Sequence, residues 1–277
     1  MNIINPNTNN QINPLGLDTN PRFSWQIKSD KRGLMQSAYQ IRVALSAIDL
    51  EGNKHLQWNS EKVFSDQSIW VDYNGSELKA KHTYYWQVRA WDENDNVSGW
   101  SEIGCWQMGL LKPEDRGNAQ WIALDKENDA DRLVPGLFCK KMPDDFGNRK
   151  VANHRLPIFR KEFIIRKSVK RATLFISGLG HFEATINGQK TTENFLEPGW
   201  TNYDRSAQYG SYDVTSLMKT DENAIAVMLG NGMYSVPNKR HFMFTGSFGL
   251  PKLILQLYIE YSDGSTDRLV SDKTWKT

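Results

Sequence analysis

Short segments whose side chains alternate between two faces recur along most of this sequence. The clearest is residues 84–91, YYWQVRAW, in which even positions hold Tyr, Trp, Val and Ala and odd positions include Gln87 and Arg89. A period of two is typical of β-strands, whose successive side chains point to opposite faces of a sheet. We therefore predict that Gln87 and Arg89 lie opposite Trp86 and Val88. Aromatic residues occur on both faces, so the pattern does not say which face is the core.

The first part of the chain contains several segments of this kind. Besides residues 84–91, they cover residues 22–27, 40–45 and 68–73. Short strands with turn signals roughly every 8–12 residues predict an antiparallel β-sandwich over residues 15–110. Residues 1–14 are rich in Asn and show almost no apolar periodicity, so we expect a flexible lead-in there.

The later part of the chain repeats the pattern. Its strand-like segments are residues 158–165, 172–177, 182–186, 224–229, 253–261 and 268–270, with a short helical turn at 214–218. Asn187-Gly188 is expected to close a hairpin, because both residues tolerate positive φ. These segments predict a second antiparallel β-sandwich over residues 118–277. The proline-containing stretch 111–157 is expected to form an irregular excursion with a solvated acidic loop at 125–131.

Composition agrees with an all-β chain and excludes several functions. Trp, Tyr and Phe make up 12% of the 277 residues, and their flat rings pack well on pleated sheets. The net charge of +2 supplies no strong field, so neither nucleic acid nor an anionic membrane is an expected partner. No apolar run approaches the ~20 residues of a transmembrane helix. The first ten residues show no signal-peptide pattern.

Metal binding and disulfide bonding are not indicated either. Cys105 and Cys139 are too few for a disulfide framework or a four-ligand zinc site, so we expect two buried thiols. The five histidines lack the spacing of zinc enzymes.

Two stretches between predicted strands combine aromatic and amide side chains. They are residues 197–204, EPGWTNYD, and residues 229–234, LGNGMY. Proteins bind sugars through aromatic faces that cover C–H surfaces and through amides or carboxylates that bond hydroxyls, and such residues tend to lie on loops. The stretches therefore point to sugar contact. The structural alternative is that Trp200 and Tyr203 close one end of the sandwich.

These and other motifs resemble known domains. The first sandwich resembles a fibronectin type III-like domain in Trp25, in residues 84–92 and in residues 98–102, SGWSE. Nearly the whole chain, in order, resembles the bacterial α-L-rhamnosidases of glycoside hydrolase family 78. The motifs that carry this resemblance are NPLGLD (13–18), PRFSW (21–25), PIFRKEF (157–163), ING (186–188), PGWTNY (198–203), YDVT (212–215) and LGNGMY (229–234).

The resemblance implies a fibronectin type III-like module followed by a jelly-roll-like rhamnosidase N-terminal β-sandwich that recognises substrate. The expected ligand is a rhamnose-containing carbohydrate, contacted by Asn187, Trp200, Asn202, Tyr203, Asn231 and Tyr234. In some relatives a module of this kind binds L-rhamnose with help from calcium. Many relatives have Asp where this chain has Asn202, and Trp where it has Met233. Because the missing carboxylate removes a charged ligand, we expect no metal and no other cofactor here.

The resemblance also implies where catalysis takes place. In this family two carboxyl groups, about 6.5–9.5 Å apart as in other inverting glycosidases, belong to an (α/α) barrel further along the chain. This sequence shows no run of amphipathic helices, so we expect no catalytic residue and no activity of the chain alone. The expected protein partner is the catalytic domain of the parent protein, and the family implies a periplasmic or extracellular location.

Two other functions remain open at this level. One is a structural or adhesive pair of β-sandwiches that docks other protein domains, which exposed rings among Trp58, Trp70, Trp100 and Trp121 would favour. The other is glycoside hydrolysis by the chain itself. The available carboxylates for that reaction are Glu183, Glu197 and Asp204, and no spacing pairs them.

Overall fold

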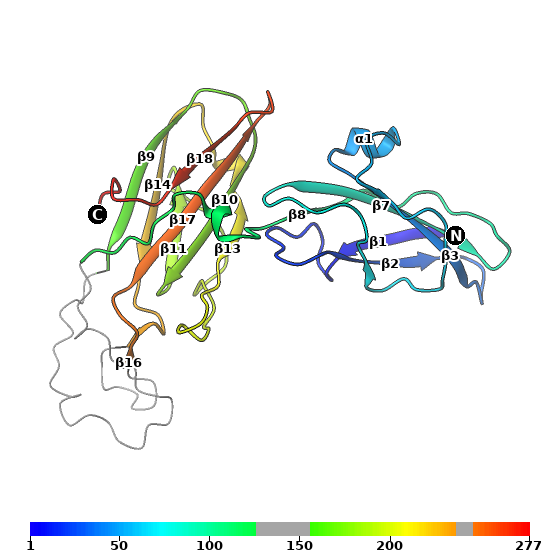
Figure 1. Cartoon of the computed structure of the whole chain (residues 1–277), viewed down its shortest axis with the longest axis horizontal. Coiled ribbons are helices and arrows are strands. Elements are labelled where there is room, and N and C mark those ends of the chain that lie inside the picture. Colours follow the sequence, from blue (N-terminus) through cyan, green and yellow to red (C-terminus); the bar gives the residue numbers. More distant parts are fainter. Residues whose placement is uncertain (126–155, 237–245) are drawn as a thin grey trace, which may run out of the picture. The chain divides into compact units, whose positions relative to one another are not determined.

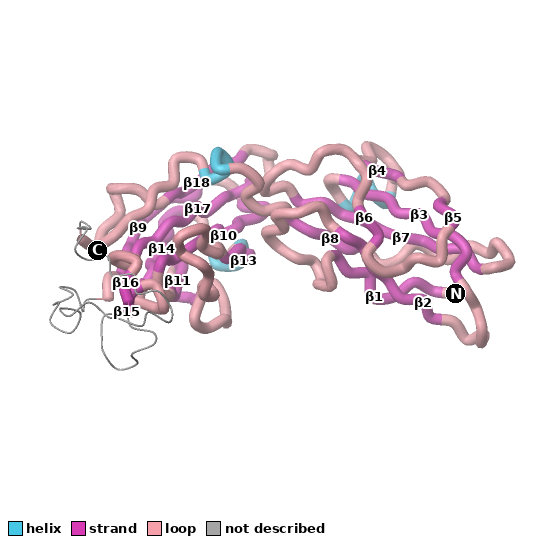
Figure 2. The backbone as a smooth tube through the Cα atoms, turned by 60° about the horizontal axis from the view of Figure 1, so that its bottom comes forward, coloured by secondary structure: helices cyan, strands magenta, loops and turns pink. Residues whose placement is uncertain are grey.

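The computed structural model describes residues 1–125, 156–236 and 246–277. The chain divides into two compact units, residues 1–115 and residues 116–277 (Figure 1). Strands dominate both units, and the helices are short (Figure 2). The prediction of an all-β chain is confirmed. Cys139 and residues 126–131 of the expected acidic loop lie outside the described residues.

The first unit is a sandwich of two antiparallel sheets. One sheet has the order β1-β2-β6, with β1 at Asn2–Thr8, β2 at Arg22–Lys28 and β6 at Val71–Asp72. The other has the order β4-β3-β7-β8, with β4 at Trp58–Asn59, β3 at Gln36–Ala44, β7 at Thr83–Asp92 and β8 at Gly104–Gln107. Strand β5 (Val63–Phe64) pairs with β3, helix α1 covers Ala47–Glu51, and the 3-10 helix η1 covers Pro113–Arg116.

Aromatic rings fill the core of this unit. Phe23, Trp86 and Trp106 are fully buried, and the rings of Phe23 and Trp86 lie 4.4 Å apart between centroids. The even-numbered residues of 84–91 face this core, which confirms the predicted alternation and identifies the inner face. Arg89 lies on the outer face, where its Nε donates to Gln40 Oε1 at 2.9 Å.

The expected flexible lead-in is wrong, because residues 2–8 form strand β1. This strand pairs antiparallel with β2, and Ile3 is buried in the core. Asn5, Asn9 and Asn10 have positive φ, a conformation that Asn tolerates better than most residues. The Asn-rich composition therefore specifies a strand irregularity and turns rather than disorder.

Two further expectations for the first unit need correction. The predicted strand at residues 68–73 is reduced to Val71–Asp72, because Trp70 has φ +56° and interrupts the extended chain. Cys105 is only half-buried, since it lies in the edge strand β8.

The second unit consists of two four-stranded antiparallel sheets, the arrangement of a jelly roll. The first sheet has the order β13-β10-β17-β18, with β13 at Gly210–Asp213, β10 at Val169–Leu179, β17 at Lys252–Tyr261 and β18 at Thr266–Val270. The second has the order β12-β11-β14-β9, with β12 at Gln189–Lys190, β11 at Phe182–Ile186, β14 at Asp221–Leu229 and β9 at Ile158–Ile165. A small ribbon joins β15 (Ser235–Val236) to β16 (Gly246–Ser247).

Apolar residues from both sheets form the core of the second unit. Leu174, Val227 and Leu255 are examples, each almost completely buried. Asn187 and Gly188 both have positive φ and connect β11 to β12, which confirms the predicted hairpin. The short helical turn predicted at 214–218 is present as the 3-10 helix η3, Thr215–Leu217. No helix in the described ranges is long and apolar enough to span a membrane.

Candidate functional site

Two loops of the second unit meet at the start of strand β11. The first loop, residues 191–209, joins β12 to β13, and the second, residues 230–234, follows β14. The backbone N–H of Phe182 donates to the carbonyl of Glu197 at 2.8 Å, and that of Gly230 donates to the carbonyl of His181 at 2.7 Å. These bonds bring together the two stretches that the sequence singled out, although they are far apart along the chain.

Glycine allows the chain segments to approach closely at this junction. Gly180 has φ +124°, and a Cβ atom on it would lie 2.2 Å from the carbonyl oxygen of Gly230. Gly232 has φ +54°, and a Cβ atom there would lie 2.9 Å from the backbone nitrogen of His181. Any side chain at either position would push the second loop away from the turn between β10 and β11.

Three aromatic rings stabilise this end of the unit. Tyr203 meets the rings of Tyr234 and Phe248 edge-on, with centroid distances of 5.2 and 5.3 Å. Tyr234 is only 6% exposed, and its hydroxyl donates to the carbonyl of Phe248 at 3.1 Å. Burial raises the pKa of the Tyr203 hydroxyl. Tyr234 therefore holds the loop together and presents no face to solvent, while Tyr203 is half-buried beside it.

Trp200 and Asn202 lie on the outside of the first loop. The Trp200 side chain is 50% exposed. Asn202 anchors the turn that follows, because its Oδ1 accepts from the N–H of Asp204 at 3.2 Å and its carbonyl accepts from the N–H of Ser206 at 2.9 Å. The turn thus presents an indole ring and an amide group on a backbone that local hydrogen bonds fix.

Phe195 and Leu196, which the sequence did not single out as site residues, lie exposed on the same loop. They are 82% and 72% exposed, and Leu196 has φ +59°. A leucine in the left-handed region is strained, and such strain is often found where a side chain serves binding. The signal in the sequence was an apolar pair directly before the polar motif that begins at Glu197.

The structure brings Asn231 to this site but not Asn187. Asn231 is half-buried on the second loop, and none of the described residues bonds its side-chain amide. Asn187 lies at the opposite end of β11, where its Nδ2 donates to Leu217 O at 2.9 Å and to Asn223 Oδ1 at 2.8 Å. Its Oδ1 accepts from the N–H of Ala224 at 3.0 Å. These bonds use both N–H donors of the amide and give Asn187 a structural role at the hairpin, and its contact with sugar stays a prediction.

The donor atoms here do not suit a calcium ion. Asn202 Oδ1 already accepts a backbone hydrogen bond. Within the described ranges, no three His, Cys, Asp or Glu side chains gather as metal ligands. Two of the carboxylates that the sequence offered have other partners, since Glu183 pairs with Lys190 at 2.6 Å and Glu197 accepts from Asn194 at 2.9 Å.

The rings that would favour protein docking differ in exposure. Trp70 and Trp121 are 51% and 39% exposed, whereas Trp58 and Trp100 are half-buried.

Comparison with known proteins identifies both units. A family model described as the Rha78A-like N-terminal immunoglobulin domain matches residues 3–112. A second model, described as the α-L-rhamnosidase N-terminal domain, matches residues 167–277. Immunoglobulin and fibronectin type III domains share the sandwich architecture observed in the first unit.

Whole proteins match over the same residues. An α-L-rhamnosidase of Formosa agariphila is 36% identical over 282 residues, which cover 97% of this chain and 28% of that protein. The solved α-L-rhamnosidase of Dictyoglumus thermophilum has a TM-score of 0.81 at 33% identity. That match covers 100% of this chain and 29% of the Dictyoglumus chain. The solved Streptomyces avermitilis α-L-rhamnosidase complexed with L-rhamnose has a TM-score of 0.81 at 23% identity. That match covers 99% of this chain and 41% of the Streptomyces chain. This chain therefore spans only part of each relative, 28% of the curated one.

Proposed function

Since the chain belongs to the α-L-rhamnosidases, as the N-terminal region of such a protein, we propose that its second unit binds terminal L-rhamnose of a glycan. By holding this sugar, the unit positions the glycan for a catalytic domain of the parent protein. The whole protein then removes α-L-rhamnose from glycans or glycosides, and the two β-sandwiches act as its accessory region.

The exposed surface of the first loop carries this proposal. L-Rhamnose is a deoxy sugar with a methyl group and an apolar C–H face, and Trp200 offers an indole ring for that face. Asn202 and Asn231 offer amides that bond neighbouring hydroxyls. The Tyr203–Tyr234–Phe248 cluster keeps the backbone fixed beneath them, which lowers the entropy lost on binding. The Streptomyces avermitilis relative was solved with L-rhamnose, which agrees with this choice of ligand.

Titration of the 277-residue chain with L-rhamnose, followed by calorimetry with and without calcium, tests the proposal. Binding is expected in the millimolar range and is expected to be the same in both buffers. Trp200→Ala should weaken it by about 1–3 kcal/mol, because the stacking surface is lost. Ile164→Ala is the matched control, since Ile164 is an equally exposed apolar residue in β9 of the same unit. The absence of any response at millimolar rhamnose in both buffers would overturn the proposal.

Exposed Phe195 and Leu196 favour a second candidate function, docking of a protein domain. Two such apolar side chains on one loop exceed what a single sugar ring covers. In that case the double variant Phe195→Ser/Leu196→Ser would abolish association with the separately expressed catalytic domain in analytical ultracentrifugation. Rhamnose binding without any such association would rule this function out.

A further inference from the structure

A hollow in the first unit has features that the second-unit site does not explain. It has a volume of about 550 Å³, and its walls include Asn10, Asn20, Arg22, Trp70 and Asp72. These residues come from the turn after β1, the start of β2 and the β6 region. The indole ring of Trp70 is 51% exposed beside the hollow.

Trp70 combines a strained backbone conformation with an exposed ring. Its φ is +56°, which is rare for a bulky residue. The conformation is held by a hydrogen bond from its backbone N–H to Ser24 Oγ at 3.0 Å, across 46 residues of sequence. A tryptophan kept at a strained position with half of its surface exposed gives up much of the packing that its ring could supply, and contact with a ligand would explain this exposure.

The orientation of the ring is fixed from two sides. Its Nε1–H donates to Asn10 Oδ1 at 3.0 Å, and the guanidinium carbon of Arg22 lies 5.6 Å from the ring centroid. Arg22 Nε in turn donates to Asp72 Oδ1 at 3.0 Å. A ring held in this manner loses little freedom when a ligand stacks on its remaining surface.

The polar groups around the ring suit the hydroxyls of a neutral sugar. Arg22 and Asp72 are both more than half exposed, and they offer donors and acceptors side by side. No described residue bonds the amides of Asn20 or the Nδ2 group of Asn10. Because Asp72 balances the charge of Arg22, the hollow has no surplus charge that would select a uronic acid.

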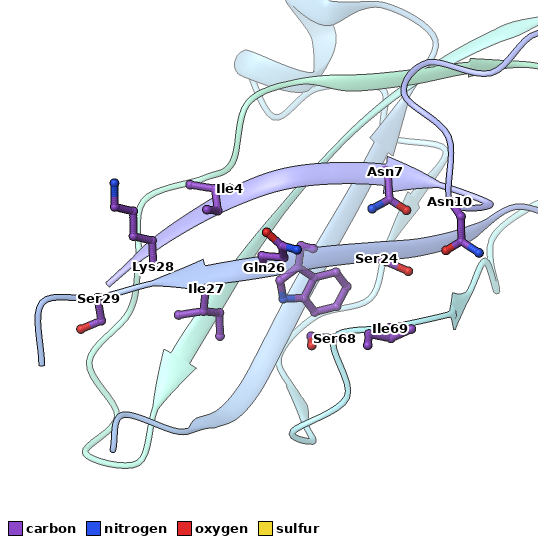
Figure 3. Close-up of a pocket in the computed structure, with 11 residues that line it drawn as sticks. Ile4, Asn7, Asn10, Ser24, Gln26, Ile27, Lys28, Ser29, Ser68 and Ile69 are labelled. Carbon is purple, nitrogen blue, oxygen red and sulfur yellow. The ribbon is translucent and has the colours of Figure 1, made fainter. Parts of the chain in front are cut away.

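Two further hollows share lining residues with this one. A neighbouring hollow of about 690 Å³ shares Asn10 with it, and a third of about 370 Å³ shares Thr19 and Asn20. Figure 3 shows Asn7 and Asn10 at one end of the larger neighbour and Lys28 and Ser29 at the other, along strands β1 and β2. The three adjoining hollows therefore provide room for several linked sugar rings rather than for one.

We propose that the first unit carries a binding site for a neutral oligosaccharide. One pyranose ring stacks on Trp70, its hydroxyls bond to Arg22, Asp72 and Asn10, and the neighbouring rings occupy the adjoining hollows. This site is separate from the L-rhamnose site proposed for the second unit, so either can exist without the other.

The test follows the indole Nε1–H resonance of Trp70 in ¹⁵N-labelled full chain, assigned with the Trp70→Phe variant. The probes are D-glucose, D-galactose, L-rhamnose, cellotetraose, xylotetraose and β-1,4-galactotetraose at concentrations up to about 50 mM, which covers millimolar affinities. At least one tetrasaccharide is expected to shift this resonance saturably and to bind about tenfold more tightly than any of the three monosaccharides. The site is refuted when none of the six sugars moves the resonance.

Variants separate ligand binding from a structural role. Trp70→Gly removes the ring and allows the positive φ, so it should abolish tetrasaccharide binding measured by calorimetry. The melting temperature should change little, because the relieved strain offsets the lost ring contacts. Ile48→Ala, at an exposed position on α1 outside the hollows, and Trp200→Ala, in the second unit, should both leave the Trp70 response intact. A melting temperature that falls in Trp70→Gly, while calorimetry still detects tetrasaccharide binding, would assign Trp70 to folding and overturn the proposal.

Discussion

Replacing Trp100 by Ala should destabilise the first unit through the loss of two cation–π contacts. The segment that contains Trp100 is hydrogen-bonded to β7. The N–H of Ser98 donates to Ala90 O at 2.9 Å, and the N–H of Ser101 donates to Val88 O at 2.8 Å. The ring then lies with the guanidinium carbons of Arg42 and Arg89 at 4.0 and 4.7 Å from its centroid. Arg42 is only 8% exposed, and among the described residues no carboxylate hydrogen-bonds to it.

The expected magnitude follows from the burial of each guanidinium. Burial and the nearby Arg89 lower the pKa of Arg42, and the charge of Glu51 offsets part of this effect. The Trp100 ring is a further favourable partner for this buried guanidinium. A desolvated cation–π contact contributes about 2 kcal/mol and an exposed one about 0.5–1 kcal/mol. Trp100→Ala should therefore cost about 2.5 kcal/mol. For a unit of this size, that lowers its melting temperature by about 10 °C.

Differential scanning calorimetry of the full chain measures this shift in the transition of the first unit. Phe195→Ala is the matched control, because Lys190 Nζ lies 5.7 Å from the centroid of that exposed ring, and its cost should stay below about 0.5 kcal/mol. A double-mutant cycle with Arg42→Met should give a coupling of about 2 kcal/mol. A shift no larger than that of the control, or a coupling near zero, would refute the assignment of stability to these contacts.

Two more outcomes are expected in the second unit. Asn187→Ala should lower its stability by about 3 kcal/mol in urea unfolding, because three hydrogen bonds and a residue suited to φ +53° are lost, while rhamnose affinity of the folded variant stays unchanged. Tyr212→Phe should raise stability by about 1 kcal/mol, because the buried Tyr212 hydroxyl has no hydrogen-bond partner among the described residues. Burial, with the charge of Glu197 adding to it, raises the pKa of Tyr212 to about 12. The unfolded chain therefore ionises first, and the free energy of unfolding should fall between about pH 10 and pH 12, less steeply in Tyr212→Phe.

Much of the strand content of this protein is readable from local pattern. The alternation at 84–91 places Trp86 inside and Arg89 outside because successive side chains of a strand point in opposite directions wherever the strand lies. Asn187-Gly188 specifies its hairpin for a similar reason, since positive φ at both residues is a property of those two residues alone.

The prediction from local pattern was wrong where polar residues adopt unusual backbone conformations. Asn5, Asn9 and Asn10 look like the composition of a disordered segment, yet their positive φ values shape the strand and turns of residues 2–10. Pairing with β2 and burial of Ile3 offset the entropy cost of ordering this segment, and neither is visible in residues 1–14 alone.

The candidate site is likewise visible in part from the sequence and decided in part by tertiary contacts. The residue types at Trp200, Asn202 and Asn231 indicate sugar chemistry from the sequence, because aromatic and amide groups on loops are what hydroxylated ligands require. Which of them meet depends on bonds between distant segments, such as that from Phe182 to Glu197, and these bonds leave Asn187 at the other end of its strand. Trp70 shows this most clearly, because Ser24, 46 residues earlier, holds its backbone and Asn10 orients its ring. Strand direction is set by neighbouring residues, whereas a binding surface is set by contacts that exist only after the chain has folded.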